Sequence, residues 1–144
     1  MANIQGQLSI ASGYQRLGFY SFSNTSPAGA YYHFKTNARL AEYVMTRVEA
    51  IGINYADQYP IRCSWVWYTY DYLTNTGVGT IYSGLTAQNG IYMSSDGYVC
   101  FRGYTPANND VAFTLNATHA NPTGAGYSIS ILAASQNSTS GNYY

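Results

Sequence analysis

Charge is scarce in this chain of 144 residues. Only 8% of the residues are Asp, Glu, Lys or Arg, whereas about a quarter are charged in an ordinary soluble domain. Six basic and six acidic side chains give a formal net charge of zero. A protein without a basic excess lacks the electrostatic footprint of nucleic-acid or anionic-membrane binding, so we expect neither partner.

Long apolar runs and a leader are also missing. No stretch approaches the roughly 18 consecutive apolar residues of a membrane-spanning helix. The start, MANIQGQLSI, lacks the basic region and apolar core of a secretion signal. We therefore expect a soluble protein that is made in the cytoplasm and does not insert into a membrane.

The residues that build enzyme and metal sites are few, and their spacing does not combine them. His33 and His119 are the only imidazoles, and together with Cys63 and Cys100 they lack the spacing of a zinc finger or knuckle. No Gly-x-Ser-x-Gly elbow is present, and no spacing selects a pair of carboxylates for glycoside hydrolysis. The glycines of residues 77–84 lack the lysine of a phosphate loop. We expect no enzyme, no metal and no cofactor.

The two cysteines are predicted to be free, buried thiols. Cys63 and Cys100 occur in a chain without an export signal, and the cytosol keeps thiols reduced. A disulfide between them is the alternative if the protein matures outside the cell.

Aromatic residues, by contrast, are abundant. Seventeen tyrosines raise the aromatic fraction to 17%, and tyrosine favours strands and half-wet surfaces. Turn-forming residues recur about every eight to twelve positions, which is typical of a sandwich or barrel of short strands. We expect one domain over residues 1–144, an all-β antiparallel sandwich with a jelly-roll-like topology.

Residues 43–49 show the alternation of a half-buried strand. Val44, Thr46 and Val48 fall on one face, and the residues between them fall on the other. A helix over residues 37–51 is the competing interpretation, because Leu40, Val44 and Val48 are also spaced by four. The β-branched and aromatic residues of the second half favour the strand.

The strongest predicted strand covers residues 61–73, IRCSWVWYTYDYL. One of its faces carries Ile61, Cys63, Trp65, Trp67 and Thr69, and the opposite face is also bulky. Such a strand is either central in a sandwich or covered on its second face by another subunit.

Further strands and one hairpin follow from the same patterns. Residues 90–104 predict a hairpin whose tight turn is Asp96-Gly97. Val111, Phe113 and Leu115 are expected to point inward, and Ile129 and Ile131 to share a face. Turns are predicted at residues 23–29 and 121–126, which contain Pro and Gly.

The segment YYHFKTN, residues 31–37, places a histidine and the only lysine of the chain among aromatic rings. In an extended strand Tyr32 and Phe34 share the predicted core face, and His33 and Lys35 lie on the wet or interface side. Asn37 is expected to end this strand. The polar tail, residues 136–144, is disordered by default, and a partner subunit is the natural candidate to hold it.

Exposed tyrosines are the candidate binding residues. Tyrosine rings can stack on sugars, and they can equally form cross-strand packing or a symmetric subunit interface. The sequence does not separate these uses. The candidates for an interface or for glycan stacking are Tyr68, Tyr70, Tyr72, Tyr82 and Tyr92.

Three strings carry a resemblance to a known family: YYHFKTNARLAEYVMTRVEAIGINY, SSDGYVCFRGY and NPTGAGYSISILAAS. In this order they resemble a β-rich domain of tailed-bacteriophage virion surface proteins, especially those of cyanophages and other aquatic phages. The resemblance covers residues 30–135, between N-terminal strands or an arm (residues 1–29) and a C-terminal tail (residues 136–144). It implies a non-enzymatic protein of the virion, homotrimeric like most fibre proteins.

The chain departs from a fibre protein in having no collagen-like repeat, heptad shaft or large N-terminal anchoring domain. We therefore expect a small accessory module on capsid or tail, either a capsid cement (decoration) protein or a tail-fibre-associated one. Its partners would be copies of itself and the major capsid or tail proteins. The alternative is a carbohydrate-binding, receptor-recognition module that contacts a glycan of the host cell surface.

Overall fold

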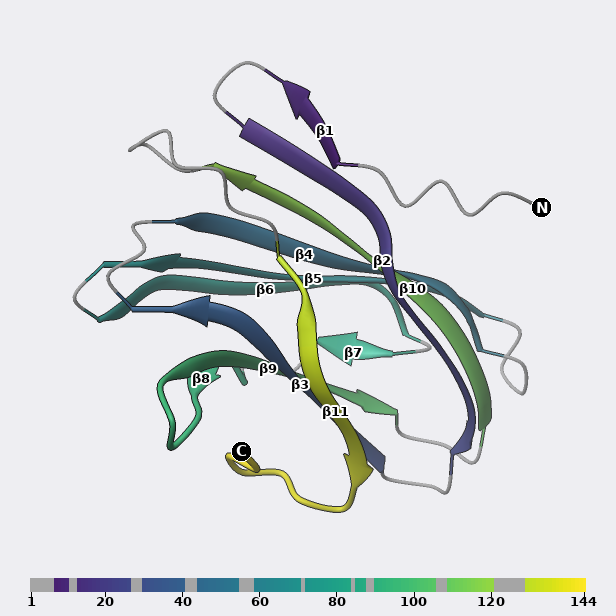
Figure 1. The fold of residues 1–144 in the computed structure, drawn as a ribbon. Helices are drawn as coiled ribbons and strands as arrows, with labels where there is room; N and C mark the ends of the chain where they lie inside the picture. Colours follow the sequence, from purple (N-terminus) through teal and green to yellow (C-terminus); the bar gives the residue numbers. More distant parts are fainter. Residues whose placement is uncertain are drawn as a thin grey trace.

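The protein is an antiparallel β-sandwich, seen in a computed structural model as two sheets packed face to face (Figure 1). The predicted all-β class is thereby confirmed, and no helix occurs in the part of the chain that the structure describes. The described residues are 7–10, 13–26, 30–40, 44–54, 59–70, 72–83, 85–87, 90–105, 109–120 and 129–144.

The larger sheet has six strands in the order β1-β2-β10-β4-β5-β6. All its neighbours are antiparallel, and β4, β5 and β6 form a meander. The strands are β1 (Gln7–Ile10), β2 (Gly13–Ser26), β4 (Met45–Asn54), β5 (Tyr59–Thr69), β6 (Leu73–Ser83) and β10 (Asn109–Ala120).

The smaller sheet has five strands, four of them in the order β11-β3-β9-β7, with β8 pairing the start of β9. The strands are β3 (Ala30–Arg39), β7 (Thr86–Ala87), β8 (Tyr92–Met93), β9 (Tyr98–Thr105) and β11 (Ile131–Asn137). Strands β9, β10 and β11 alternate between the sheets, but β4, β5 and β6 stay within one. The strand order therefore does not confirm the expected jelly roll.

The period-two patterns are confirmed where they were strongest. Residues 45–54 form a strand and not a helix; Thr46 and Val48 are buried, whereas Met45 and Arg47 are exposed. Strand β5 lies between β4 and β6, and its predicted inner face is buried along its whole length. The inner-face residues are Ile61, Cys63, Trp65, Trp67 and Thr69.

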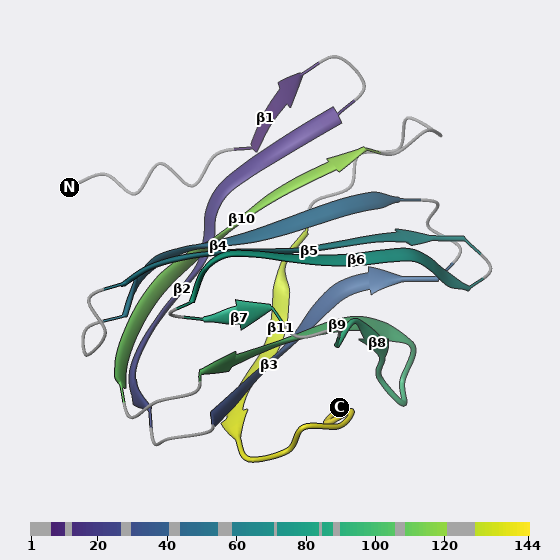
Figure 2. The ribbon, with the colours of Figure 1, turned by 180° about the vertical axis from the view of Figure 1, so that it is seen from behind.

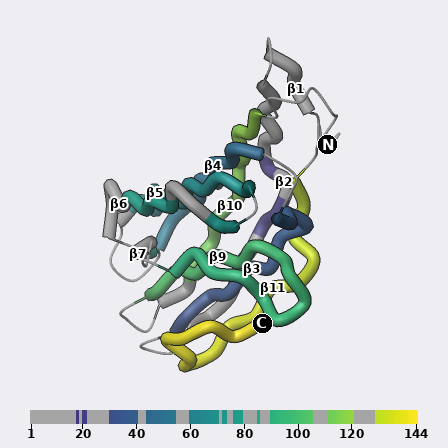
Figure 3. Tube along the Cα trace, turned by 90° about the vertical axis from the view of Figure 1, so that its left-hand side faces the viewer, coloured from purple at the N-terminus to yellow at the C-terminus, as the bar shows by residue number. Residues whose placement is uncertain are grey.

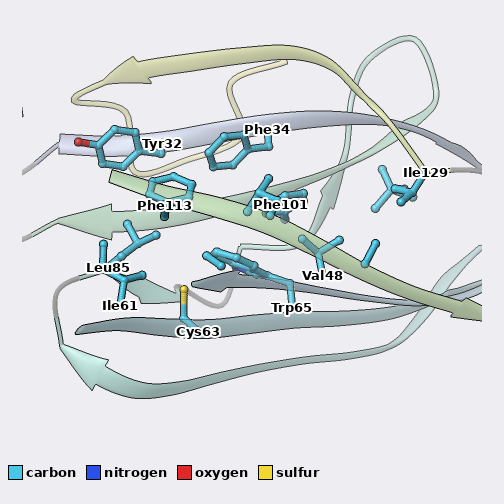
Figure 4. Packing of buried hydrophobic residues seen from close by; sticks show 14 of the residues in the cluster. Tyr32, Phe34, Val48, Ile61, Cys63, Trp65, Leu85, Phe101, Phe113 and Ile129 are labelled. Atoms are coloured by element: carbon cyan, nitrogen blue, oxygen red, sulfur yellow. The ribbon is translucent and has the colours of Figure 1, made fainter. Parts of the chain in front are cut away.

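Aromatic rings from both sheets fill the core between them (Figure 4). The rings of Phe34 and Phe101 stack with centroids 5.0 Å apart, and the ring of Trp65 lies 4.7 Å from Phe101. The indole Nε1–H of Trp65 in β5 donates to the carbonyl oxygen of Arg102 in β9 at 2.8 Å. This bond joins the two sheets directly.

Two glycines with positive φ mark a turn and a bulge. Gly97 (φ 84°) closes the predicted hairpin, in which the N–H of Ser94 donates to the carbonyl of Tyr98 at 2.8 Å. Gly18 (φ 57°) lies where the register of β2 and β10 shifts, and its N–H donates to Oδ1 of Asn116 at 2.7 Å. Glycine adopts such φ values without steric cost, and β2 bends sharply along its length (Figure 2).

Three expected strand ends are wrong. The strand predicted over residues 61–73 ends at Thr69, and Leu73 begins the next strand, β6. Strand β2 continues through Ser26, inside the predicted turn, whose residues 27–29 lie outside the described part. Strand β3 continues past Asn37 to Arg39. The reason is pairing: the N–H of Asn37 donates to the carbonyl of Ser130 at 3.1 Å, and its Oδ1 accepts from the N–H of Ser130 at 2.8 Å. The predicted turn at 121–126 also lies outside the described residues.

Candidate functional site

The outer face of the six-stranded sheet exposes apolar side chains. We call this surface the open face, because no described segment of the chain lies over β4, β5 and β6 on that side (Figure 3). Met45 is 55% exposed and Ile53 is 62% exposed. The outward residues that define the open face are Met45, Arg47, Glu49, Ile51, Ile53, Arg62 and Tyr70.

An ion-pair network divides the open face. Glu49 Oε1 lies 2.9 Å from Nε of Arg62 and 3.3 Å from Nη2 of Arg47. Exposed pairs of this kind contribute at most about 1 kcal/mol each to stability. Their main effect is to hold both arginine side chains in place between Met45 at one end of β4 and Ile53 at the other.

The structure brings some of the predicted tyrosines together and separates others. The rings of Tyr68 and Tyr70 stack at 6.4 Å with an interplanar angle of 17°, and Tyr72 follows in the turn after β5 at 63% exposed. Tyr82 lies in β6, but its side chain is outside the described part. Tyr92 is buried on the other sheet, so its ring is not presented to a surface ligand.

The second candidate surface is the outer face of the smaller sheet, onto which the C-terminal tail folds back (Figure 3). The carbonyl of Thr139 bonds Nε2 of His33 at 2.8 Å, and the carbonyl of Gly141 accepts from Nη1 of Arg102 at 2.8 Å. The N–H of Tyr143 donates to the hydroxyl of Tyr92 at 3.3 Å. We call His33, Tyr92 and Arg102 the tail seat. The tail, for which disorder was the default, is thus held by hydrogen bonds to β3, β8 and β9 of its own chain.

His33 was expected on the wet or interface side of its strand; it does lie on the outer side of β3, but the tail contacts it there and its ring is completely buried, so it is not wet. Nε2 faces a carbonyl oxygen and therefore carries the proton, so Nδ1 accepts from the hydroxyl of Tyr92 at 3.0 Å. Burial lowers the pKa of His33; the bond to Thr139 opposes this effect, and the nearby Arg102 cation adds to it. The ring is held neutral as a structural hydrogen-bonding group.

Lys35 remains partly exposed, as predicted for its side of the strand. Its Nζ pairs with Oδ2 of Asp96 at 2.6 Å and lies 5.9 Å from the ring centroid of Tyr144. The hydrogen bond from Lys35, followed by that from Ser94, lowers the pKa of Asp96. Burial raises the pKa of Tyr144 to about 12. Lys35 therefore links β3 to the hairpin and to the end of the tail.

Arg102 is the seat residue that sequence reasoning missed. Its guanidinium carbon lies 5.9 Å from the ring centroid of Tyr31, and the backbone of Gly90 packs so closely that a Cβ there would lie 2.6 Å from Nε. Arg102 faces His33 across β3 and β9. Because this pairing joins distant parts of the chain, no local pattern could have indicated it.

The cysteines are free and buried, as predicted. Cys63 belongs to the core between the sheets, where burial raises its pKa to about 12. Cys100 lies on β9 opposite Lys35 and Tyr92, and burial raises its pKa to about 11. Because the thiolate is the reactive form, neither thiol is a nucleophile near neutral pH.

The described residues contain no group of three or more His, Cys, Asp or Glu side chains that could hold a metal ion. None of the described segments forms a helix long and apolar enough to span a bilayer.

Comparisons with models of known protein families, with curated proteins and with solved structures found no match to this chain.

Proposed function

We propose that the protein is a structural protein of a bacteriophage virion, a small β-module made in the host cytoplasm and attached to capsid or tail through its open face. The observation that carries this proposal is the exposure of Met45, Ile51 and Ile53 on β4. An antiparallel sheet that faces water on one side carries mainly polar residues there. Ile51 and Ile53 are neighbours on the outward side of β4, and exposed apolar patches rimmed by polar residues mark interaction sites.

The open face suits a protein partner. A flat sheet face presents its side chains in a regular array, and the network of Arg47, Glu49 and Arg62 supplies charges that can orient a partner. The partner is either another copy, in a homotrimer, or a major capsid or tail protein. The three sequence strings that resemble phage surface modules give the same class of function.

A paired substitution tests the role of the open face. Ile53→Asp places a charge on this face, and Leu132→Asp does the same at another exposed apolar position, 51% exposed, on β11 of the other sheet. Both variants should unfold at the temperature of the wild type. We expect Ile53→Asp to reduce incorporation into particles at least tenfold, and Leu132→Asp to be incorporated normally.

Particles that lack the protein identify its role. A cement protein predicts capsids that lose thermal or osmotic stability but still adsorb to the host, and cryo-electron microscopy should place the protein on the capsid lattice. A tail-associated module would appear at the tail instead. Equal incorporation of both aspartate variants, together with unchanged particles, would contradict the proposal.

A carbohydrate-binding module is the second candidate, because Tyr68 and Tyr70 present parallel rings next to the exposed Tyr72. Such rings can stack on sugar faces. A glycan array probed with purified protein tests this function, with Tyr70→Ala and Tyr72→Ala expected to abolish binding. Tyr104→Ala, on the other sheet, is the matched control.

A further inference from the structure

The tail seat recognises the backbone of the tail. Its hydrogen bonds go to the carbonyl oxygens of Thr139 and Gly141 and to the N–H of Tyr143. The groups that make them come from three strands, β3, β8 and β9. Binding of an extended peptide through main-chain hydrogen bonds is a recurring mode of protein recognition.

Side-chain contacts add selectivity for the end of the tail. The ring of Tyr143 lies 5.3 Å from that of His33, and the ring of Tyr144 packs at 5.0 Å against Tyr143. The Nζ of Lys35 faces the Tyr144 ring, 5.9 Å from its centroid, as in a cation–π contact. The seat therefore fits a short polar segment followed by two aromatic residues.

The tail can leave its seat without breaking a strand. Strand β11 ends at Asn137, and the Oδ1 of Asn137 accepts from the N–H of Thr139 at 2.8 Å, which turns the chain back over the sheet. Residues 138–143 are themselves exposed. An empty tail seat would leave His33 and Tyr92 without their hydrogen-bond partners from the tail. Because losing those hydrogen bonds costs free energy, the occupied state is favoured.

We propose that the tail seat is a peptide-binding site that also takes the C-terminal segment, residues 138–144, of a second copy of the chain. Strand β11 is the last strand of its sheet, so opening the turn at Asn137 directs the tail beyond the sheet edge toward a neighbour. The contacts in trans are those seen in cis, as in domain swapping. The tail of the same chain competes for the seat at an effective concentration of about 1 mM. Exchange between copies therefore requires a similarly high local concentration of chains, as in a dense assembly. This inference does not depend on the open face.

The first experiment uses the full chain with a protease site inserted between Asn137 and Ser138, cut after folding. A fluorescent peptide of sequence STSGNYY is added, and its anisotropy is measured. We expect saturable binding that unlabelled peptide reverses and a scrambled peptide does not. Arg102→Ala should weaken binding at least about tenfold, because a hydrogen bond from a charged group is lost. Thr118→Ala, exposed on β10, should bind like the parent.

The second experiment uses the uncut chain and does not require a cut protein to stay folded. Sedimentation velocity should detect dimers as the protein approaches about 1 mM. Excess STSGNYY should dissociate these dimers, and Arg102→Ala should prevent them. A chain that stays monomeric throughout overturns the proposal, as does a folded, cut chain that binds no peptide. Dimers that the peptide leaves intact also overturn it, because they would form through another surface such as the open face.

Discussion

At the scale of single residues, the indole of Trp65 joins the two sheets, whereas its neighbour on the same face does not. Trp65 and Trp67 are both completely buried. Nε1 of Trp65 donates to the carbonyl of Arg102, but Nε1 of Trp67 has no hydrogen-bond partner among the described residues. The two side chains therefore separate the contribution of ring volume from that of the hydrogen bond between the sheets.

Trp65→Phe should lower the free energy of unfolding by about 3 kcal/mol, because it leaves a cavity and removes the hydrogen bond to the Arg102 carbonyl. Trp67→Phe should cost less, since it leaves a similar cavity but removes an indole N–H that has no partner. Urea unfolding followed by far-UV circular dichroism measures both losses. Equal losses would show that the bond to Arg102 contributes nothing.

The histidine beneath the tail predicts a dependence on pH. Because its pKa is lowered in the closed structure, the form with the tail released takes up a proton more readily. The contribution of His33 to tail binding is fully present above its ordinary pKa of about 6.5. It falls as the pH drops below that value, by at most about 1.4 kcal/mol per pH unit. Protonation also adds a cation close to Arg102 and Lys35 and turns Nδ1 into a donor facing Tyr92.

Hydrogen exchange of the Tyr143 amide between about pH 8 and about pH 5 tests this dependence. After correction for intrinsic exchange, protection should decrease on the acid side of the range. His33→Gln, whose amide can still donate to Thr139, should show a flatter profile. Asp96 has a lowered pKa and titrates below the range. A profile that His33→Gln leaves unchanged would assign the pH dependence to another group.

At the scale of elements, β4 and β10 approach too closely for a side chain at Gly52. A Cβ there would lie 2.5 Å from Cα of Phe113 and closer still to the carbonyl oxygen of Ala112. Both are backbone atoms of the paired strand and cannot move alone. By contrast, a Cβ at Gly77 in β6 would meet nothing within 4 Å.

Gly52→Ala should therefore destabilise the protein by about 3 kcal/mol, because the two strands must separate. Gly77→Ala should be neutral or stabilising by up to about 1 kcal/mol, since it restricts only the unfolded chain. Thermal and urea unfolding of the pair measure the difference. Similar stabilities of the two variants would contradict the close packing of β4 on β10.

The elements also show what sequence could and could not predict. The buried faces of β4 and β5 and the turn at Asp96-Gly97 follow from patterns within a few residues, and the structure confirms them. The tail seat requires contacts across 106 positions between His33 and Thr139. Alternation placed His33 on the outer side of β3 correctly, but it does not indicate whether water or another segment covers that side.

At the scale of the whole molecule, the two outer faces differ. The six-stranded sheet exposes Met45 and Ile53, whereas the smaller sheet is partly covered by the tail, which presents exposed, mainly polar residues 138–143. A module attached through the open face would direct its tail away from the attachment surface. In that arrangement one face would contact the particle, and the opposite face would carry a tail that a second copy could replace.

The two thiols lie at different depths of this architecture. Cys63 is in the core between the sheets, and Cys100 is on the outer side of β9 beside the tail seat. Alkylation at about pH 8 should be slow at both, because burial raises both pKa values. Cys100 should nevertheless react first, and faster still in Arg102→Ala. Mass spectrometry of the two cysteine-containing peptides over time measures both rates; equal rates would mean that the tail opens only when the whole domain unfolds.

The placement of these thiols allows their alkylation rates to report two different opening motions of the chain. The alkylation rate of Cys100 reports how often the tail leaves the tail seat, and the alkylation rate of Cys63 reports how often the two sheets separate. Each rate can be measured in a purified sample without adding a probe to the protein. A second copy whose tail occupies the tail seat would slow the alkylation of Cys100 and leave that of Cys63 unchanged.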